Sequence, residues 1–263
     1  MSLDLIKEGF SLFVKNLQIN IPVYLLIFLG YLIIAYSLIS VIPGDVFEEI
    51  GMKYQKGELN EKEVLQKMGD AFYADFTKNI STILLFSFLV FILHEFDIAG
   101  LTASSLKIAR EGYASIRYFF ESAYLNTMKV IKIDLLGILI LIALSSPSFI
   151  LYYLNFPILG EAYMSISMTI IFLLLTFSKF AIVDRDAGVF DAVARGSAFL
   201  LRNSFTVILA FFAWFVISFP IITLSAVFPP LFLALPLVIT LFHTMMGVLY
   251  SRSEGSALPY SNE

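Results

Sequence analysis

The chain has 263 residues, of which 59% are hydrophobic and only 14% are Asp, Glu, Lys or Arg. Soluble domains carry about 25% charged residues and about 45–50% apolar ones, so this composition excludes an ordinary soluble domain and predicts an all-α integral membrane protein. The formal net charge of −4 gives no basic excess for a nucleic-acid partner. The absence of cysteine excludes disulfides and thiolate metal sites.

Residues 1–16 form an amphipathic segment that contains both acids and bases. The segment lacks the basic region, the short apolar core and the small-residue cleavage site of a signal peptide. We therefore expect the first apolar span to be retained in the mature protein.

Six apolar segments follow, and each is long enough to cross a hydrocarbon core, which takes about 20 residues. They cover residues 17–43, 80–106, 130–154, 161–183, 204–228 and 230–250. Short turns at 155–160 and 227–230 join the last two pairs, so the partners of each pair are expected to be antiparallel. We predict one transmembrane domain over residues 1–250 and a flexible tail over 251–263.

The loop at residues 44–79 predicts the orientation of these spans. It holds five of the 17 Lys and Arg residues together with eight acids, whereas the other 12 bases lie in segments expected on the opposite side of the membrane. By the positive-inside rule the loop is outside and both termini are cytoplasmic, in the cell membrane of the source. The loop itself predicts a helix from Asn60 to Lys78, with Asn60 and Glu63 as a capping box.

A short pattern precedes the first, third and fifth spans. Gly9, Lys15 and Asn16 recur at the same offsets as Gly196, Arg202 and Asn203, and a weaker copy has Ala123 and Lys129. Each copy reads as an interfacial helix whose apolar side chains dip into the lipid and whose last base snorkels to the headgroups. We therefore expect three units of surface helix plus transmembrane hairpin, at about 1–106, 107–183 and 184–250.

Two parts of the chain resemble a known family. The first is residues 180–203, FAIVDRDAGVFDAVARGSAFLLRN. The second lies in the second unit and consists of residues 109–112 (AREG), Phe119, Phe120 and 129–131 (KVI). The chain resembles the membrane domain of glycerophosphoryl diester phosphodiesterases and related archaeal and bacterial six-span families of unknown function. In these, a span ends in an acidic residue and glycine, followed by a helix with a basic residue. The resemblance implies a fold and a topology. It implies no catalytic residues, because no segment of this chain is long enough for the soluble domain of that enzyme.

Ionisable residues inside a span are energetically costly and are functional candidates. His94, Glu95 and Asp97 lie near the middle of the second span, and His94 and Asp97 share a helix face. We expect an intramembrane polar core whose members are His94, Glu95, Asp97, Asp134, Glu161 and His243.

Three interpretations of this core stay open. It can relay protons or cations, since imidazole and carboxylate groups titrate; it can hold a metal, with His94, Asp97 and His243 as ligands; or it can join helices as a structural polar network. Gly100 and Ser104 in the same span predict close helix packing. Lys15, Lys129 and Arg202 are the expected headgroup contacts, and Lys179 is expected at the interface.

Three functions are compatible with these observations. The first is a small transport or channel-like protein for an ion or a small solute, built around the second span. The second is a non-catalytic membrane module that organises lipids or partner proteins through the basic surface helices. The third is an intramembrane metal-dependent enzyme, the least favoured of the three, and no organic cofactor is predicted.

Overall fold

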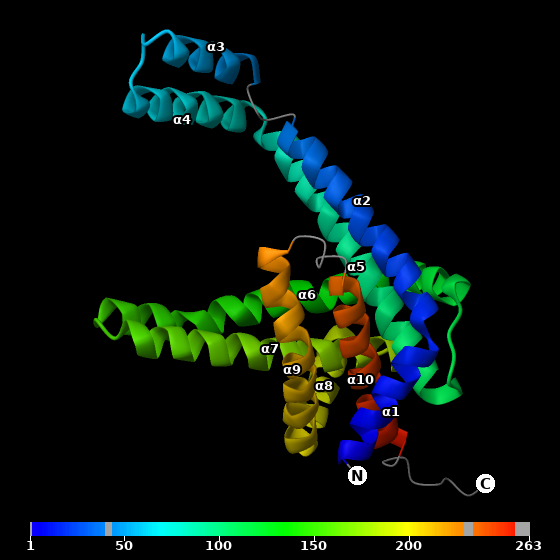
Figure 1. Ribbon diagram of the computed structural model, residues 1–263. Coiled ribbons are helices and arrows are strands. Elements are labelled where there is room, and N and C mark those ends of the chain that lie inside the picture. Colours follow the sequence, from blue (N-terminus) through cyan, green and yellow to red (C-terminus); the bar gives the residue numbers. More distant parts are fainter. Residues whose placement is uncertain (1, 40–43, 229–233, 256–263) are drawn as a thin grey trace, which may run out of the picture. The chain divides into compact units, whose positions relative to one another are not determined.

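The computed structural model describes residues 2–39, 44–228 and 234–255, and within these ranges it contains helices and connecting turns but no strand (Figure 1). The helices are α1 (Ser2–Lys15), η1 (Leu17–Ile19), α2 (Asn20–Ile39), α3 (Gly44–Gln55), α4 (Glu61–Lys78), α5 (Ile80–Glu111), α6 (Ile116–Tyr153), α7 (Pro157–Arg185), α8 (Val189–Arg202), α9 (Ser204–Val227) and α10 (Leu235–Gly255). The predicted all-α class is confirmed for the described residues.

Five stretches in these ranges are long and apolar enough to cross a membrane: Leu17–Ile39, Ile80–Glu111, Ile116–Tyr153, Pro157–Arg185 and Ser204–Ser225. They correspond to the first five predicted spans and make the chain a polytopic membrane protein. The sixth predicted span begins at Pro230, outside the described residues. Its described part, α10, is not among the five, and it carries Thr240, His243 and Thr244 within its apolar sequence.

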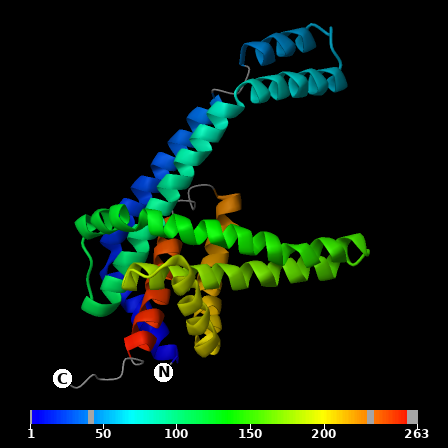
Figure 2. The ribbon, with the colours of Figure 1, turned by 180° about the vertical axis from the view of Figure 1, so that it is seen from behind.

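The chain divides into two compact units, Leu26–His94 on the one hand and Met1–Leu25 with Glu95–Glu263 on the other. In the first unit, the second half of α2 and the first half of α5 run side by side, and the rings of Tyr36 and Phe86 meet edge to face at 5.5 Å (Figure 2). Helices α3 and α4 pack together beyond them. The capping box predicted for α4 is confirmed, because Glu63 N donates to Asn60 Oδ1 at 3.0 Å and Asn60 N donates to Glu63 Oε2 at 2.9 Å.

Helix α10 forms the centre of the second unit. All its residues from Thr240 to Tyr250 are buried, and it packs against α1, α7 and α9. Bulky side chains of α7, α8 and α10 fill the core, and the ring of Phe177 lies 4.4 Å from that of Phe199. Because α10 has protein on every side, its threonines and His243 are kept away from lipid.

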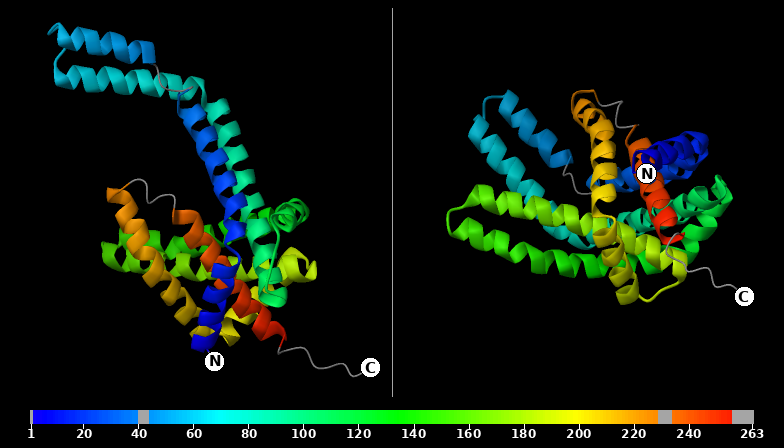
Figure 3. Two further views of the ribbon diagram at one scale, coloured as in Figure 1. Left: turned by 45° about the vertical axis from the view of Figure 1, so that its right-hand side comes forward. Right: turned by 90° about the horizontal axis from the view of Figure 1, so that it is seen from below.

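Helices α6 and α7 form a long antiparallel hairpin, as predicted (Figure 3). The helices approach closely at Gly137, where an added Cβ would lie 2.5 Å from Leu175 Cδ1. Pro147 does not interrupt α6. Proline leaves the carbonyl four residues earlier without its donor, and the Ser146 hydroxyl donates to that carbonyl, of Ala143, at 2.8 Å.

The helix ends differ from one copy of the predicted surface motif to the next. Helices α1 and α8 end at Lys15 and Arg202, each directly before an asparagine. In the second copy α6 runs on without a break through the predicted junction near Val130. The expectation of a separate surface helix there was wrong. Valine stands at the asparagine position in this copy.

Candidate functional site

Three long helices bring ionisable side chains together inside the second unit. The Lys179 ammonium of α7 lies 2.7 Å from Asp134 Oδ2 of α6, and both side chains are about 15% exposed (14% and 15%). Glu95 of α5 is 2% exposed, and its carboxyl group interacts with both the Asp134 carboxyl and the Lys179 ammonium. We call these three residues the ionic cluster.

The ionic cluster holds two carboxyl groups and one ammonium group. With all three ionised it carries one excess negative charge, in surroundings where charge is poorly solvated. Neighbouring carboxylates disfavour each other's ionised form. Glu95 Oε2 also has no hydrogen-bond partner among the described residues. Uptake of one proton or one monovalent cation therefore neutralises the cluster.

An apolar layer lies one helical turn from the ionic cluster. It consists of buried Ile98, Ala99 and Val130, with Val183 packed against them. Ala99, Val130 and Val183 each stand four residues from a cluster member on the same helix face. The layer thus covers the cluster on the side of the α5 C-terminus.

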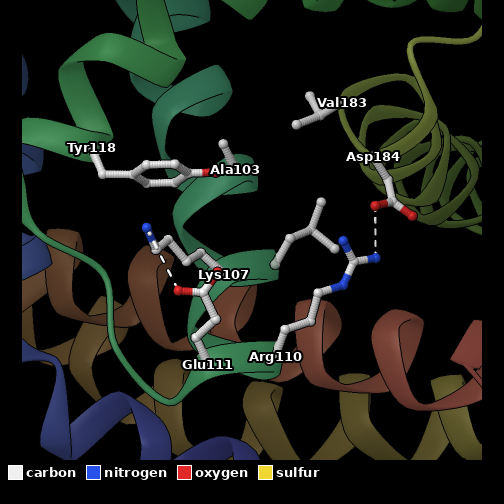
Figure 4. A pocket seen from close by; sticks show the side chains of 8 residues that line it. Ala103, Lys107, Arg110, Glu111, Tyr118, Val183 and Asp184 are labelled. Atoms are coloured by element: carbon white, nitrogen blue, oxygen red, sulfur yellow. Dashed lines mark ion pairs between the residues drawn. The ribbon is translucent and has the colours of Figure 1, made fainter.

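A polar cavity of about 230 Å³ lies on the other side of Val183 (Figure 4). Its walls are Ala103, Leu106, Lys107, Arg110 and Glu111 of α5, Tyr118 of α6, and Val183 and Asp184 of α7. Two acid–base pairs line it, and Figure 4 shows them on opposite sides of the space.

The first of these pairs is tight and the second is loose. An Arg110 guanidinium nitrogen lies 2.6 Å from Asp184 Oδ1, and the Asp184 side chain is 8% exposed. Lys107 Nζ lies 3.6 Å from Glu111 Oε2 and 4.2 Å from the centre of the Tyr118 ring. Directly after the end of α7, Asp186 Oδ1 lies 2.6 Å from Lys129 Nζ. That ammonium lowers the pKa of Asp186 from its usual value of 3.8, through a hydrogen bond and its charge.

The six residues predicted as one polar core occupy several places. Glu95 and Asp134 belong to the ionic cluster, whereas Glu161 is exposed at the other end of α7, where its carboxyl interacts with the Tyr152 hydroxyl. Asp97 is 4% exposed, and its Oδ1 has no hydrogen-bond partner among the described residues.

The two histidines also differ in their surroundings. The His94 side chain is exposed in the unit Leu26–His94. His243 is buried on α10 with Nδ1 3.1 Å from the Ile239 carbonyl oxygen. In the described part of the chain, no three His, Asp or Glu side chains are grouped so that they could hold a metal ion.

The other predicted residues are placed as follows. Lys15 and Arg202 are exposed at the ends of α1 and α8, while Lys129 pairs with Asp186. Gly100 lies against the Phe119 ring, where an added Cβ would be 2.7 Å from Cζ, and Ser104 is fully buried.

We expected Lys179 at the interface, and no sequence pattern indicated the cavity residues as a site. The signal for Lys179 was present, because a base within an apolar span is expected to pair with an acid in another span. The cavity had no sequence signal, since its walls come from three helices. No protein-family model, no curated protein and no solved structure matches the chain.

Proposed function

We propose that the chain is a small transport or channel-like membrane protein, and that the ionic cluster is its proton- or cation-binding site. The observation that carries the proposal is the buried excess of one carboxyl group over the ammonium, shared by α5, α6 and α7. A purely structural ion pair needs one acid for one base. The second buried acid supports exchange of a proton or cation.

The polar cavity and the apolar layer next to the ionic cluster support a path for protons or cations toward this site. The polar cavity can admit water and ions, and the apolar layer separates it from the ionic cluster. Apolar constrictions gate channels by excluding water. In this proposal, small movements of Val183 and Val130 open and close access to Glu95.

We also propose that six spans form three hairpins, with both termini cytoplasmic in the cell membrane and with the fold of the phosphodiesterase membrane domain that the sequence resembles. The glycine contacts of the first and third copies support the repeat. An added Cβ on Gly9 of α1 would lie 3.0 Å from Met245 Cα of α10, and one on Gly196 of α8 would lie 2.7 Å from Ser178 N of α7. Ala123, at the same position in the second copy, is fully buried.

Flux measurements in proteoliposomes test the proposed function. Vesicles that contain a pH-sensitive dye and an imposed inside-negative potential should acidify with the unsubstituted protein, and more slowly by at least tenfold with Glu95→Gln. Glu161→Gln is the matched control, because it removes an exposed carboxyl from α7, which also carries Lys179 of the ionic cluster. The same comparison is made with Na⁺ or K⁺ as the only permeant cation. Flux equal to that of empty vesicles, or full flux in Glu95→Gln, refutes the proposal.

A second candidate, the membrane module, is favoured by the apolar side chains exposed on the predicted surface helices. Phe10 of α1 is 47% exposed, and Phe190 and Leu201 of α8 are about 80% exposed (80% and 79%). Replacement of Lys15, Lys129 and Arg202 together by Gln should then reduce the number of anionic lipids retained in native mass spectra. Unchanged lipid retention argues against this candidate.

A further inference from the structure

Lys107 and Arg110 present two positive groups to one cavity. They are three residues apart, and so lie on neighbouring positions of the same face of α5. Both line the polar cavity, with the Tyr118 ring stacked on the Lys107 ammonium (Figure 4). The Arg110 side chain is 47% exposed, so its guanidinium keeps donors for a further partner besides Asp184.

The two acids of the cavity do not compete equally for these bases. The Asp184 side chain is almost fully buried and holds the Arg110 guanidinium at 2.6 Å. Glu111 is 63% exposed and 3.6 Å from Lys107, so this pair is loose and screened by water. An anion that enters the cavity can therefore replace Glu111 at the Lys107 ammonium while Arg110 stays in place.

We infer that the polar cavity binds a phosphate group, as a monoester or diester. A phosphate has several acceptor oxygens and can take donors from an ammonium and a guanidinium at the same time. The cavity volume of about 230 Å³ leaves space for a phosphate and part of the group that it esterifies. Basic pockets between transmembrane helices also accept lipid headgroups, so the phosphate comes from a lipid or from a water-soluble compound.

This inference goes beyond the proposed function and is independent of it, because binding is measured without flux. The purified protein in detergent is titrated calorimetrically with inorganic phosphate and with glycerol phosphate. In parallel, native mass spectra count bound phosphatidylglycerol against phosphatidylcholine. Binding of the soluble probes alone assigns a soluble ligand, and selective retention of phosphatidylglycerol alone assigns a lipid headgroup.

Two substitutions in the cavity should act in opposite directions. Lys107→Gln should weaken binding at least fivefold, whereas Glu111→Gln removes the competing acid and should leave binding equal or tighter. The matched control is Lys53→Gln, which breaks the similar pair of Lys53 and Glu49 in α3, neither of which lines the cavity, and should change nothing. Since Glu111 is exposed, its variant remains informative even if Lys107→Gln does not fold. Binding unaffected by Lys107→Gln, weakened by Glu111→Gln, or lost equally in Lys53→Gln overturns the inference.

Discussion

At the scale of single residues, Lys179 decides how the interior of the α5–α6–α7 group is held. Without its ammonium, the carboxyl groups of Glu95 and Asp134 face each other in a buried site with no opposite charge among the cluster members. The sequence could show that each of these residues lies in an apolar span, but not that three separate spans bring them together. Their meeting depends on the rotation of each helix about its axis, which local sequence patterns determine only coarsely.

Lys179→Met should destabilise the folded protein by about 3 kcal/mol, the order expected when one partner of a buried ion pair is removed. The measurement is the free energy of unfolding in mixed detergent micelles. The double variant Lys179→Met with Asp134→Asn should recover part of the loss, because it removes one of the two uncompensated carboxylates. A loss in Lys179→Met no greater than that of the exposed control Lys62→Met would contradict this account.

Gly100 offers a second test at this scale, because it lies directly under the Phe119 ring. Gly100→Ala should destabilise the protein by about 1–3 kcal/mol, since the ring must move to admit the methyl group. Gly30→Ala is the control, because an added Cβ there meets nothing within 4 Å. Equal unfolding free energies for the two variants would show that the Phe119 ring moves aside without destabilising the protein.

At the scale of elements, apolar runs were sufficient to predict the spans, because a lipid-crossing helix leaves a long continuous signal in the sequence. The five candidate spans fall on predicted segments, and the α4 cap followed from the local spacing of Asn60 and Glu63. Helix ends between surface and membrane segments were harder to predict. The motif before the third span shared a small residue and a base with the others, yet the residue after the base differs, and there the helix continues.

Asn16 shows what that residue does in the first copy. Its side-chain amide donates to the Leu12 and Gly112 carbonyls at 2.9 and 3.0 Å, and its Oδ1 accepts from Ala114 N at 3.3 Å. It therefore ties the end of α1 to the link between α5 and α6. The first helix is thereby joined to elements that come about a hundred residues later in the chain.

Asn16→Ala should cost about 2 kcal/mol of unfolding free energy, since it leaves the buried Ala114 N–H without its acceptor. Asn126→Ala is a suitable control, because among the described residues the Asn126 amide bonds within its own helix, to Ser122 and Lys129. Hydrogen exchange provides a second readout, in which protection should fall at Gly112–Ala114 in the Asn16 variant alone. Unchanged protection at these amides would remove the proposed tie.

At the scale of the whole molecule, the number of crossings decides on which side of the membrane the C-terminus lies. Five crossings from a cytoplasmic N-terminus place the C-terminus outside, whereas six place it inside. The absence of cysteine makes the test direct, since each introduced thiol is the only one in the chain. Lys7→Cys on α1, Lys56→Cys after α3 and Ser253→Cys near the end of α10 sample the three informative positions.

Intact cells are treated with a membrane-impermeant maleimide, with and without prior permeabilisation. The thiol at position 56 should react in intact cells, and those at positions 7 and 253 only after permeabilisation. We expect position 253 inside because α10 packs against α1, α7 and α9, and its Thr240, His243 and Thr244 are buried away from lipid. A helix in that environment can cross the membrane with a more polar sequence than a lipid-facing one. Labelling of position 253 in intact cells would instead require α10 to remain on one side, and would exclude the three-hairpin repeat.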